Sequence, residues 1–439
     1  MVSSTTPTAT SSESSTKASA RMLAVTDMAR LLRRIFEVER EFLRTATTLI
    51  YRVGEPELKY MISQHTWESA QHARFLKERG REMAGFGSGE GVREAIRNLF
   101  EEAASPPDGA VALAGFYRVI KPTLLEAYRH YLRVTDHLAD WPTKQLLQEF
   151  IADEERHGEE IRKYLGNNEE SRWCDHLRAA VTSIGGLLGL GVATDFDWRH
   201  PAAPYTHPAT CSRGRYPVTS SVFGHDPESD PIVREWLVDP ATDARVLRVM
   251  VYVWLMNEMD AVDYLATVFY DTPQAPLEMH YDMARHLWDE SRHSQFGFRQ
   301  LPKLGIDIMT VEHALDLFNI LVQMPPPERY AMMTMEFEAG SFPTKAIVMD
   351  RIRELNDFEA DTLLAFDRND EQNHVRYGHR WLGDLMKLHG IETDVGDFVE
   401  ATRTKFTEYA GIYGGKVAHT LPREKRLTGK KILRKYGLS

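Results

Sequence analysis

Two short stretches in which a glutamate precedes a histidine by three residues constrain the fold of this chain most strongly. They place Glu290 near His293 and Glu371 near His374. On an α-helix, residues three apart lie on one face, about one turn from each other. One such pair is common on solvated helices. Two pairs in one chain favour a four-helix bundle whose helices turn metal-binding side chains inward.

Two further glutamates lie at matching depth in such a bundle. When antiparallel helices are joined by a short turn, residues equally far from the turn reach the same level. Glu258 and Glu290 are equally far from a proline-rich turn near position 274, and Glu338 and Glu371 from a turn near position 355. Each arm is about 16 residues, or roughly 24 Å of helix. Glu336 is a rival to Glu338 for the third-helix position.

Composition limits the class of protein. The chain has 439 residues, 43% of them hydrophobic and 27% charged, which is typical of a globular protein with two or three domains. A net charge of -11 argues against general nucleic-acid binding, and no apolar run is long enough to span a membrane. The two cysteines, Cys174 and Cys211, form neither a disulfide framework nor a thiolate metal site. We therefore expect a cytoplasmic protein that binds neither nucleic acid nor membrane.

Helical periodicity divides the chain into five segments. Residues 1–20 are rich in Ser and Thr and are expected to be a disordered tail. We then expect a four-helix bundle over residues 21–188, an irregular linker over 189–238, a second four-helix bundle over 239–413 and a basic tail over 414–439. In the second bundle the pattern predicts helices over residues 240–271, 275–300, 309–323, 327–354, 357–389 and 394–412. The fold class is thus all-α, with two tandem bundles.

Two of these segments allow more than one interpretation. The linker is rich in Pro, Gly, His and aromatic residues. It is either an ordered connection wrapped on the two halves or a lid or substrate wall over a site. The basic tail is either solvated or docks on an acidic redox partner or subunit.

The two halves look like copies of each other. At an offset of 221 residues (72 to 293), His65 and His72 align with His286 and His293, and Ser69 aligns with Glu290. A first-half site would therefore lack a bridging carboxylate, and we expect this half to be a mainly structural copy. A vestigial or weaker metal site there would use Glu37, His72, Glu126, Glu154 and His157.

The ligand types of the second half indicate its chemistry. Four carboxylates and two imidazoles offer four negative charges, which balance two divalent cations; without cations, burying these carboxylates together is costly. Oxygen and imidazole donors without thiolate suit iron or manganese better than copper(I) or structural zinc. The predicted metal ligands are Glu258, Glu290, His293, Glu338, Glu371 and His374.

In these motifs the chain resembles the ferritin-like superfamily of carboxylate-bridged dinuclear metalloproteins. The resemblance implies two tandem ferritin-like bundles and a C-terminal site for two iron ions, with manganese as an alternative. By this resemblance Glu258 and Glu338 would be terminal ligands, and Glu290 and Glu371 would bridge the metals. Each motif histidine would bind one metal.

The resemblance also suggests residues around the ligands. Asp289 and Asp370 precede the motif glutamates, where members of the superfamily often have an aspartate that orients a ligand histidine; ordinary helix surface is the alternative. His286 lies one turn before Glu290 and is expected behind the ligands, although some N-oxygenases of the superfamily have an added histidine ligand. Pro343 is expected to kink the third helix beside the site, which opens room for a substrate or only accommodates packing.

The function that this resemblance implies is an O2-dependent di-iron oxidoreductase acting on a small organic substrate. Hydroxylation, N-oxygenation, desaturation and cleavage stay open, and an external electron donor and a homodimer fit the same interpretation. Gly297 stands where related radical-generating subunits have a tyrosine, which disfavours that activity. The alternatives are a manganese catalase, a ferritin-like protein that detoxifies peroxide or iron, and a non-enzymatic helical scaffold.

Overall fold

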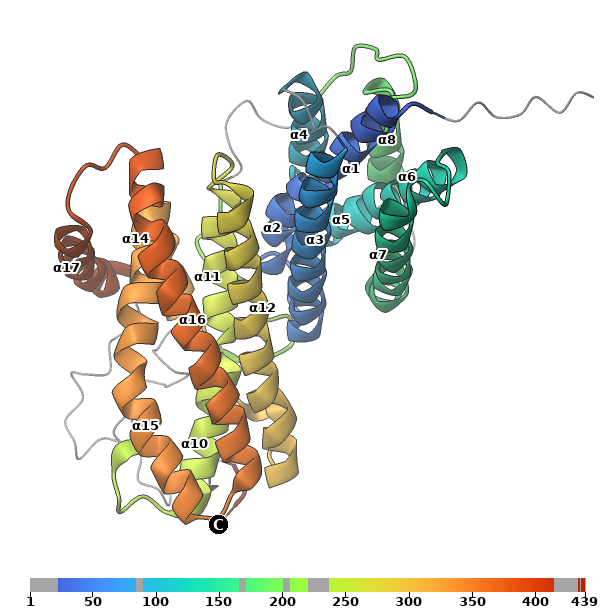
Figure 1. Ribbon diagram of the computed structural model, residues 1–439. Coiled ribbons are helices and arrows are strands. Elements are labelled where there is room, and N and C mark those ends of the chain that lie inside the picture. The colour runs from blue at the N-terminus through green and yellow to red at the C-terminus, as the bar shows by residue number, and fades with distance from the viewer. Residues whose placement is uncertain are drawn as a thin grey trace, which may run out of the picture.

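The structure is a computed structural model, and it describes residues 23–83, 90–165, 171–199, 206–219, 237–413, 433–434 and 436–438. The expected disordered tail (1–20) and most of the basic tail (414–439) lie outside these ranges. Most of the described residues are helical, which confirms the all-α fold class (Figure 1). Their one strand pairing joins β1 (Val218–Thr219) and β2 (His313–Ala314) in parallel. No helix among them is long and apolar enough to cross a membrane.

The helices of the N-terminal half begin at residues that favour helix starts. Pro56 opens α3, Pro142 lies in the first turn of α7, and the Asp108 side chain caps α5 by accepting hydrogen bonds from backbone N–H groups. α1 packs against α3, α4 and α6, and α7 packs against α3 and α6. The elements are α1 (Val25–Thr45), α2 (Thr47–Ile50), α3 (Pro56–Glu82), α4 (Glu90–Ala104), α5 (Gly109–Gly115), the π-helical η1 (Phe116–Ile120), α6 (Lys121–Val134), α7 (Trp141–Ile161), η2 (Arg162–Tyr164) and α8 (Ser171–Ser183).

Four long helical columns make up most of the C-terminal half (Figure 1). α10 and α11 form the first column, α12 the second, α14 to α15 the third and α16 the fourth. α12 packs against α10, α11 and α16, and α16 packs against α14 and α15. The elements are α10 (Ala244–Asn257), α11 (Met259–Tyr270), α12 (Leu277–Gln300), η4 (Leu301–Leu304), η5 (Ile308–Thr310), α13 (Asp316–Leu321), α14 (Pro326–Ala331), the π-helical η6 (Met332–Glu338), α15 (Ala339–Glu354), α16 (Phe358–Leu388) and α17 (Val395–Tyr413).

One local expectation, the helix over residues 309–323, differs from the structure. The helix expected over residues 309–323 is reduced to α13, because β2 pairs with β1 just before it and the Asp260 carboxylate accepts hydrogen bonds from the backbone N–H groups that start it. α15 continues through Pro343, the position of the expected kink, so this proline does not break the helix. Pro343 lies early in α15, where it removes only one backbone hydrogen bond. The irregular turn lies earlier, in η6.

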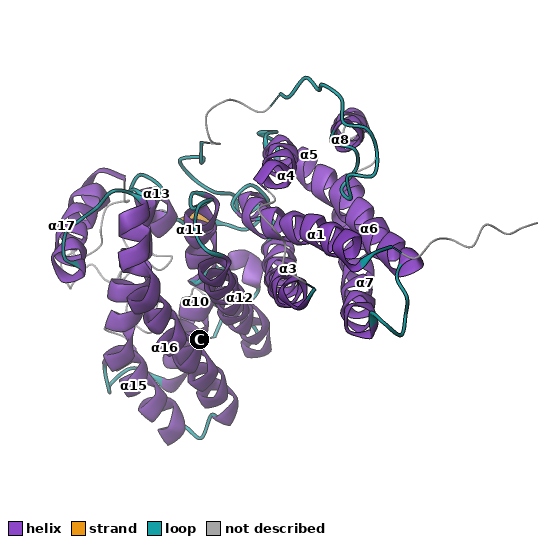
Figure 2. Cartoon of the chain, turned by 45° about the horizontal axis from the view of Figure 1, so that its top comes forward, coloured by secondary structure: helices purple, strands orange, loops and turns teal. Residues whose placement is uncertain are grey.

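The two halves meet along α3 and α12, which lie side by side in both views (Figures 1 and 2). At this junction the buried Lys59 ammonium pairs with Asp263 at 2.7 Å, and the Tyr60 hydroxyl lies 3.0 Å from the Ser294 hydroxyl. Arg213, from the segment between the halves, donates to the same Asp263 carboxylate. Part of the connecting segment is therefore built into the contact between the halves.

Candidate metal centre

All six predicted ligands of the C-terminal half are brought together in its interior. Glu258 lies at the junction of α10 and α11, α12 carries Glu290 and His293, Glu338 ends η6, and α16 carries Glu371 and His374. Glu336, the rival of Glu338, lies away from this group and pairs with Arg403 at 2.6 Å. The glutamates that lie equally far from the two turns in the sequence are thus at one level of the bundle in the structure.

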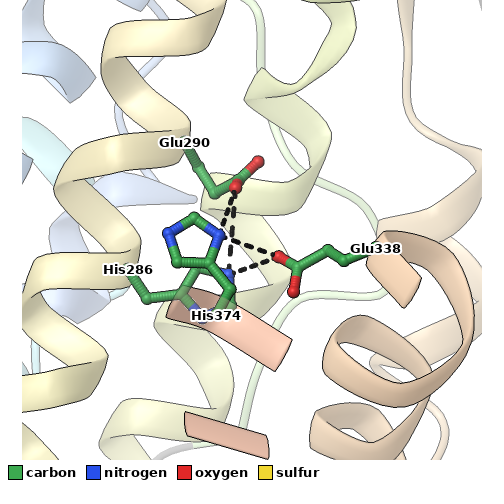
Figure 3. Close-up of side chains that lie close together, drawn as sticks. All are labelled: His286, Glu290, Glu338 and His374. Atoms are coloured by element: carbon green, nitrogen blue, oxygen red, sulfur yellow. Dashed lines mark hydrogen bonds and ion pairs between the residues drawn. The ribbon is translucent and has the colours of Figure 1, made fainter. Parts of the chain in front are cut away.

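The first group of potential ligands contains two histidines and two glutamates, His286, Glu290, Glu338 and His374 (Figure 3). Glu338 Oε1 lies 2.7 Å from His286 Nε2 and 3.1 Å from His374 Nδ1. The two imidazole rings are stacked with their centroids 3.7 Å apart. One ligand atom from each residue lies within 4.8 Å of the others, a spacing that a single cation can bridge. His286, expected behind the ligands, is therefore among the potential ligands themselves.

A second group shares Glu290 with the first. It consists of Glu258, Glu290 and His293, and His293 Nδ1 lies 3.2 Å from Glu258 Oε2 and 3.7 Å from Glu290 Oε1. The same Glu290 oxygen is 3.2 Å from His374 Nδ1 in the first group. A carboxylate between two such groups has the position of a bridge between two cations.

Glu371 belongs to a third group that the sequence did not predict. It lies with Glu258 and Asp367, and the buried Lys345 ammonium is placed among them. Lys345 Nζ lies 2.6 Å from Asp367 Oδ2, contacts Glu371 and is 3.8 Å from Glu258. Helix spacing is the one feature of the sequence that relates Lys345 and Asp367 to the centre. Lys345 lies seven residues after Glu338, two turns along the same face, and Asp367 lies one turn before Glu371.

Asp289 and Asp370 lie behind the two motif histidines. Asp289 is 3.3 Å from His374 Nε2, and Asp370 is 3.3 Å from His293 Nε2. Each aspartate thus reaches the histidine of the other helix and holds its ring with Nδ1 toward the glutamates. Arg292 contacts both aspartates, so this outer layer carries its own counter-charge.

Burial and neighbouring charges shift the proton affinities of the carboxylates in opposite directions. Burial and Asp367 raise the pKa of Glu258 to about 7, against the effects of Lys345 and His293. Burial also acts to raise the pKa of Glu338, but the adjacent His286 and His374 outweigh it and lower this pKa to about 2. Crowded carboxylates whose charge must be balanced by protons, imidazoles or an ammonium are typical of cation-binding sites.

The same charges act on the cationic partners. Burial acts to lower the pKa of His374, but Glu338 and Asp289 raise it well above its ordinary value. Burial likewise opposes the charged form of Lys345, and Asp367 and Glu371 raise the pKa of this ammonium above its ordinary value. A divalent cation bound at Nδ1 of His374 would displace the proton that this shift describes.

The N-terminal half repeats part of this arrangement. His65 stacks on His157 with centroids 3.8 Å apart, as His286 stacks on His374. His72 Nε2 lies 3.2 Å from Asp153, as His293 lies by Asp370. These matching contacts support the internal duplication that the sequence suggests.

Two predicted members of an N-terminal site lie elsewhere. Glu126 is on the surface with 58% of its side chain exposed, and it pairs with Arg129. Glu37 is buried but pairs with Arg33 at 2.7 Å, whereas Glu39 approaches His72 at 2.9 Å. The offset of 221 residues aligns Glu37 with Glu258, but the residue that approaches the histidine in this half is Glu39, two positions later. Of the predicted set, His72 and Glu154 form a group with Glu39.

Lys121 replaces the third-helix glutamate in this half. It follows the π-helical η1 directly, as Glu338 ends the π-helical η6, and each lies 33 residues before the motif glutamate of the next helix. Lys121 Nζ donates to Glu154 at 2.6 Å and lies 3.3 Å from the Ser69 hydroxyl. Ser69 and Lys121 therefore stand where the C-terminal half has two carboxylates, Glu290 and Glu338.

Comparison with known proteins adds one match. A family model described as a protein of unknown function (DUF455) matches residues 243–427. This stretch runs from the start of α10 past α17 and contains all the residues of the C-terminal centre. No curated protein and no solved structure matches the chain.

Proposed function

We propose that the chain is a non-haem di-iron oxidoreductase built from two tandem ferritin-like bundles. Its C-terminal centre would activate O2 to oxidise a small organic substrate, with electrons from an external donor. The observation that carries this proposal is the position of Glu290, whose Oε1 faces His293 in one ligand group and His374 in the other. A carboxylate shared in this way is the defining element of a carboxylate-bridged pair of metal ions.

The residues present fit such a pair of ions. Glu290 Oε1, Glu338 Oε2 and Glu258 Oε2 are buried and make no hydrogen bond, although buried oxygens are normally satisfied. Cations coordinated by these oxygens would satisfy them. The proposed ligands are Glu258, Glu290, His293, Glu338, Glu371 and His374, with His286 as an added ligand of the first group.

The chain's own residues orient and enclose the centre. Asp289 and Asp370 fix the ring orientation of the ligand histidines, which raises their basicity as donors. Tyr264 is buried near Glu338 and Glu290 and contacts the buried Met333, so these two side chains keep bulk water out. When bound, two iron ions would supply redox electrons and open coordination positions for O2. The same donor set accepts manganese, for which peroxide dismutation is the alternative reaction.

The N-terminal half is proposed to be a structural copy. An ammonium at Lys121, paired with Glu154, supplies inside the protein the positive charge that metal ions would supply in the other half. Because of this pair, the charge of the buried Glu154 is balanced without a metal ion.

Metal content and O2 consumption test the proposal. The protein is loaded anaerobically with excess Fe(II), freed of unbound iron and analysed for iron per chain. We expect about two irons per chain, and O2 consumption after exposure to air that depends on them. Glu338→Ala should reduce both strongly. Glu336→Ala is the matched control, because it changes a glutamate two residues away that pairs on the surface with Arg403.

Each other outcome has a definite meaning. Equal iron content in wild type and Glu338→Ala would contradict the centre. Manganese retained through purification, together with peroxide dismutation and no O2 consumption, would favour the catalase alternative. Iron content near four per chain would contradict the structural role of the N-terminal half.

A further inference from the structure

Lys345 is placed where a second cation of the centre would bind. Its side chain is fully buried, and Nζ lies 2.6 and 2.7 Å from the two oxygens of Asp367. It also contacts Glu371 and lies 3.8 Å from Glu258. These three carboxylates are themselves a group whose oxygens lie close enough to hold one metal ion. The ammonium and a metal ion therefore compete for the same oxygens.

The first ligand group is built differently. His286, Glu290, Glu338 and His374 face one another directly, whereas Lys345 pairs with Glu258, Asp367 and Glu371 on the other side of the centre. Two imidazoles and two carboxylates complete a four-donor site for one ion from protein atoms alone. An ion can enter this group without displacing a lysine.

The other half of the chain shows a lysine in the same role. Lys121 reaches Glu154 at 2.6 Å and lies 3.4 Å from His157 Nδ1, which are the counterparts of Glu371 and His374. An ammonium from the third helix can thus satisfy an inward-facing motif glutamate within this architecture.

The charge of the centre still permits two ions. Glu258, Glu290, Glu338, Asp367 and Glu371 carry five negative charges when ionised, and Lys345 carries one positive charge, which leaves four to balance two divalent ions. Asp367 is the carboxylate that Lys345 holds through both oxygens. The ammonium can therefore keep Asp367 and release Glu371 and Glu258 to a metal ion.

We propose that the centre loads in two unequal steps, with Lys345 holding the place of the second ion. The first ion enters the group of His286, Glu290, Glu338 and His374. The second binds at Glu258, Glu290, His293 and Glu371 only when the Lys345 ammonium withdraws to Asp367. This inference rests on the proposed function, because it concerns the same centre.

Titration of metal-free protein with Co²⁺ tests the inference without any measurement of activity. Calorimetry gives the affinity of each step, and the visible absorption of bound Co²⁺ reports its coordination. In the wild type we expect two steps whose dissociation constants differ by at least about a hundredfold, because the second ion must displace a paired charge. In Lys345→Met the second step should tighten by at least about tenfold while the first step changes little.

A double variant guards against loss of folding. Lys345→Met leaves the buried Asp367 with only His293, whose Nδ1 is 3.3 Å away, so Lys345→Met/Asp367→Asn removes both members of the lysine–aspartate pair. In this variant, too, the second step should tighten by at least about tenfold while the first step changes little. Lys121→Met/Glu154→Gln is the matched control, since it removes the equivalent pair of the other half and should leave both steps as in the wild type.

The results separate this inference from the proposed function. Two ions bound with equal affinity in the wild type, unchanged in both Lys345 variants, would overturn the inference and leave the dinuclear centre standing. If the wild type, like the Glu338→Ala variant, binds no Co²⁺, both the inference and the proposed function would be overturned. A second step that weakens without Lys345 would show that the ammonium assists binding, and would also overturn the inference.

Discussion

Lys121 and Glu338 occupy equivalent positions beside a π-helical turn, yet they carry opposite charges. In one half the lysine pairs with Glu154, and in the other the glutamate faces His286 and His374. A buried charge needs a partner of opposite sign, so under the proposed function this one position would decide whether the protein itself or bound cations balance the interior. The C-terminal half also contains a buried ammonium, Lys345, which pairs with Asp367 and Glu371.

Acid sensitivity is expected from His280, a buried histidine outside the centre. Burial and the nearby Arg40, Arg44 and Arg93 lower the pKa of His280 to about 3, while its Nε2–H donates to the Thr272 carbonyl at 2.9 Å. The unfolded chain, with an ordinary histidine pKa near 6.5, takes up a proton there that the folded chain does not. Stability from this group is thus complete above about pH 6.5 and is lost as pH falls below it.

His280→Gln removes this titration and keeps a donor for the Thr272 carbonyl. The difference in unfolding free energy between wild type and variant should shift in favour of the variant by about 1.4 kcal/mol per pH unit below pH 6. Urea unfolding between pH 7.5 and 4.5 measures it. His137→Gln, on an exposed turn, serves as the control. Parallel pH profiles for wild type and His280→Gln would contradict the prediction.

The sequence predicted which glutamates and histidines cluster in the C-terminal half better than it predicted what surrounds them. The two motifs supplied Glu290 and Glu371, and spacing from the turns then located Glu258 and Glu338, because helix geometry is regular over the distances involved. The same reasoning could not assign Lys345, since a lysine two turns from a ligand looks like ordinary helix surface until the crossing of the helices is known. The role of His286 also depended on how closely its ring approaches that of His374.

At the scale of elements, most helix boundaries in the described part of the chain follow from proline, glycine and capping residues. The π-helical turn η6 does not, since no proline or capping side chain marks it. η6 packs against α16, where a Cβ added at Gly378 would lie 2.3 Å from the Thr334 hydroxyl, so the glycine leaves room for this side chain. Glu338 is the last residue of η6 and is buried.

Gly297 allows α10 and α12 to approach each other closely. A Cβ added there would lie 2.2 Å from the Tyr252 carbonyl oxygen and 2.4 Å from the Met256 backbone nitrogen, and neither backbone atom can move alone. Gly297→Ala should lower the unfolding free energy by about 1–3 kcal/mol. It should also weaken metal binding, because Glu258 directly follows α10.

Gly383→Ala is the matched control for this prediction. Gly383 lies within α16, and its added Cβ would meet only Val395 Cγ2 at an ordinary 3.7 Å. This change should raise stability by up to about 1 kcal/mol through helix propensity. Denaturant unfolding of both variants gives the comparison. Equal effects of the two substitutions would show that α10 and α12 do not depend on the glycine for their separation.

At the scale of the whole molecule, the halves share buried charges rather than only a surface contact. Asp263 on α11 pairs with Lys59 on α3 and with Arg213 from the connecting segment, and all three are buried. The alternation of helices in the sequence indicated two halves but not this junction, because its partners are about 50 and 200 residues apart in the chain. The sequence therefore predicts the two halves but not the residues through which they contact each other.

Asp263→Asn tests whether this cluster couples the halves. Removal of one charge leaves Lys59 buried without its counter-charge and leaves Arg213 only Asp260, 3.7 Å away, which should cost about 3–5 kcal/mol. Because the cluster lies where the halves meet, we also expect calorimetric unfolding to separate into two transitions. Lys77→Ala is the control, since Lys77 also bridges the halves through Glu278, but with 25% and 48% of the two side chains exposed. That change should cost no more than about 1 kcal/mol and leave the number of transitions unchanged. Equal losses in the two variants would mean that the halves are held together by apolar packing of α3 on α12, with the buried charges contributing no coupling.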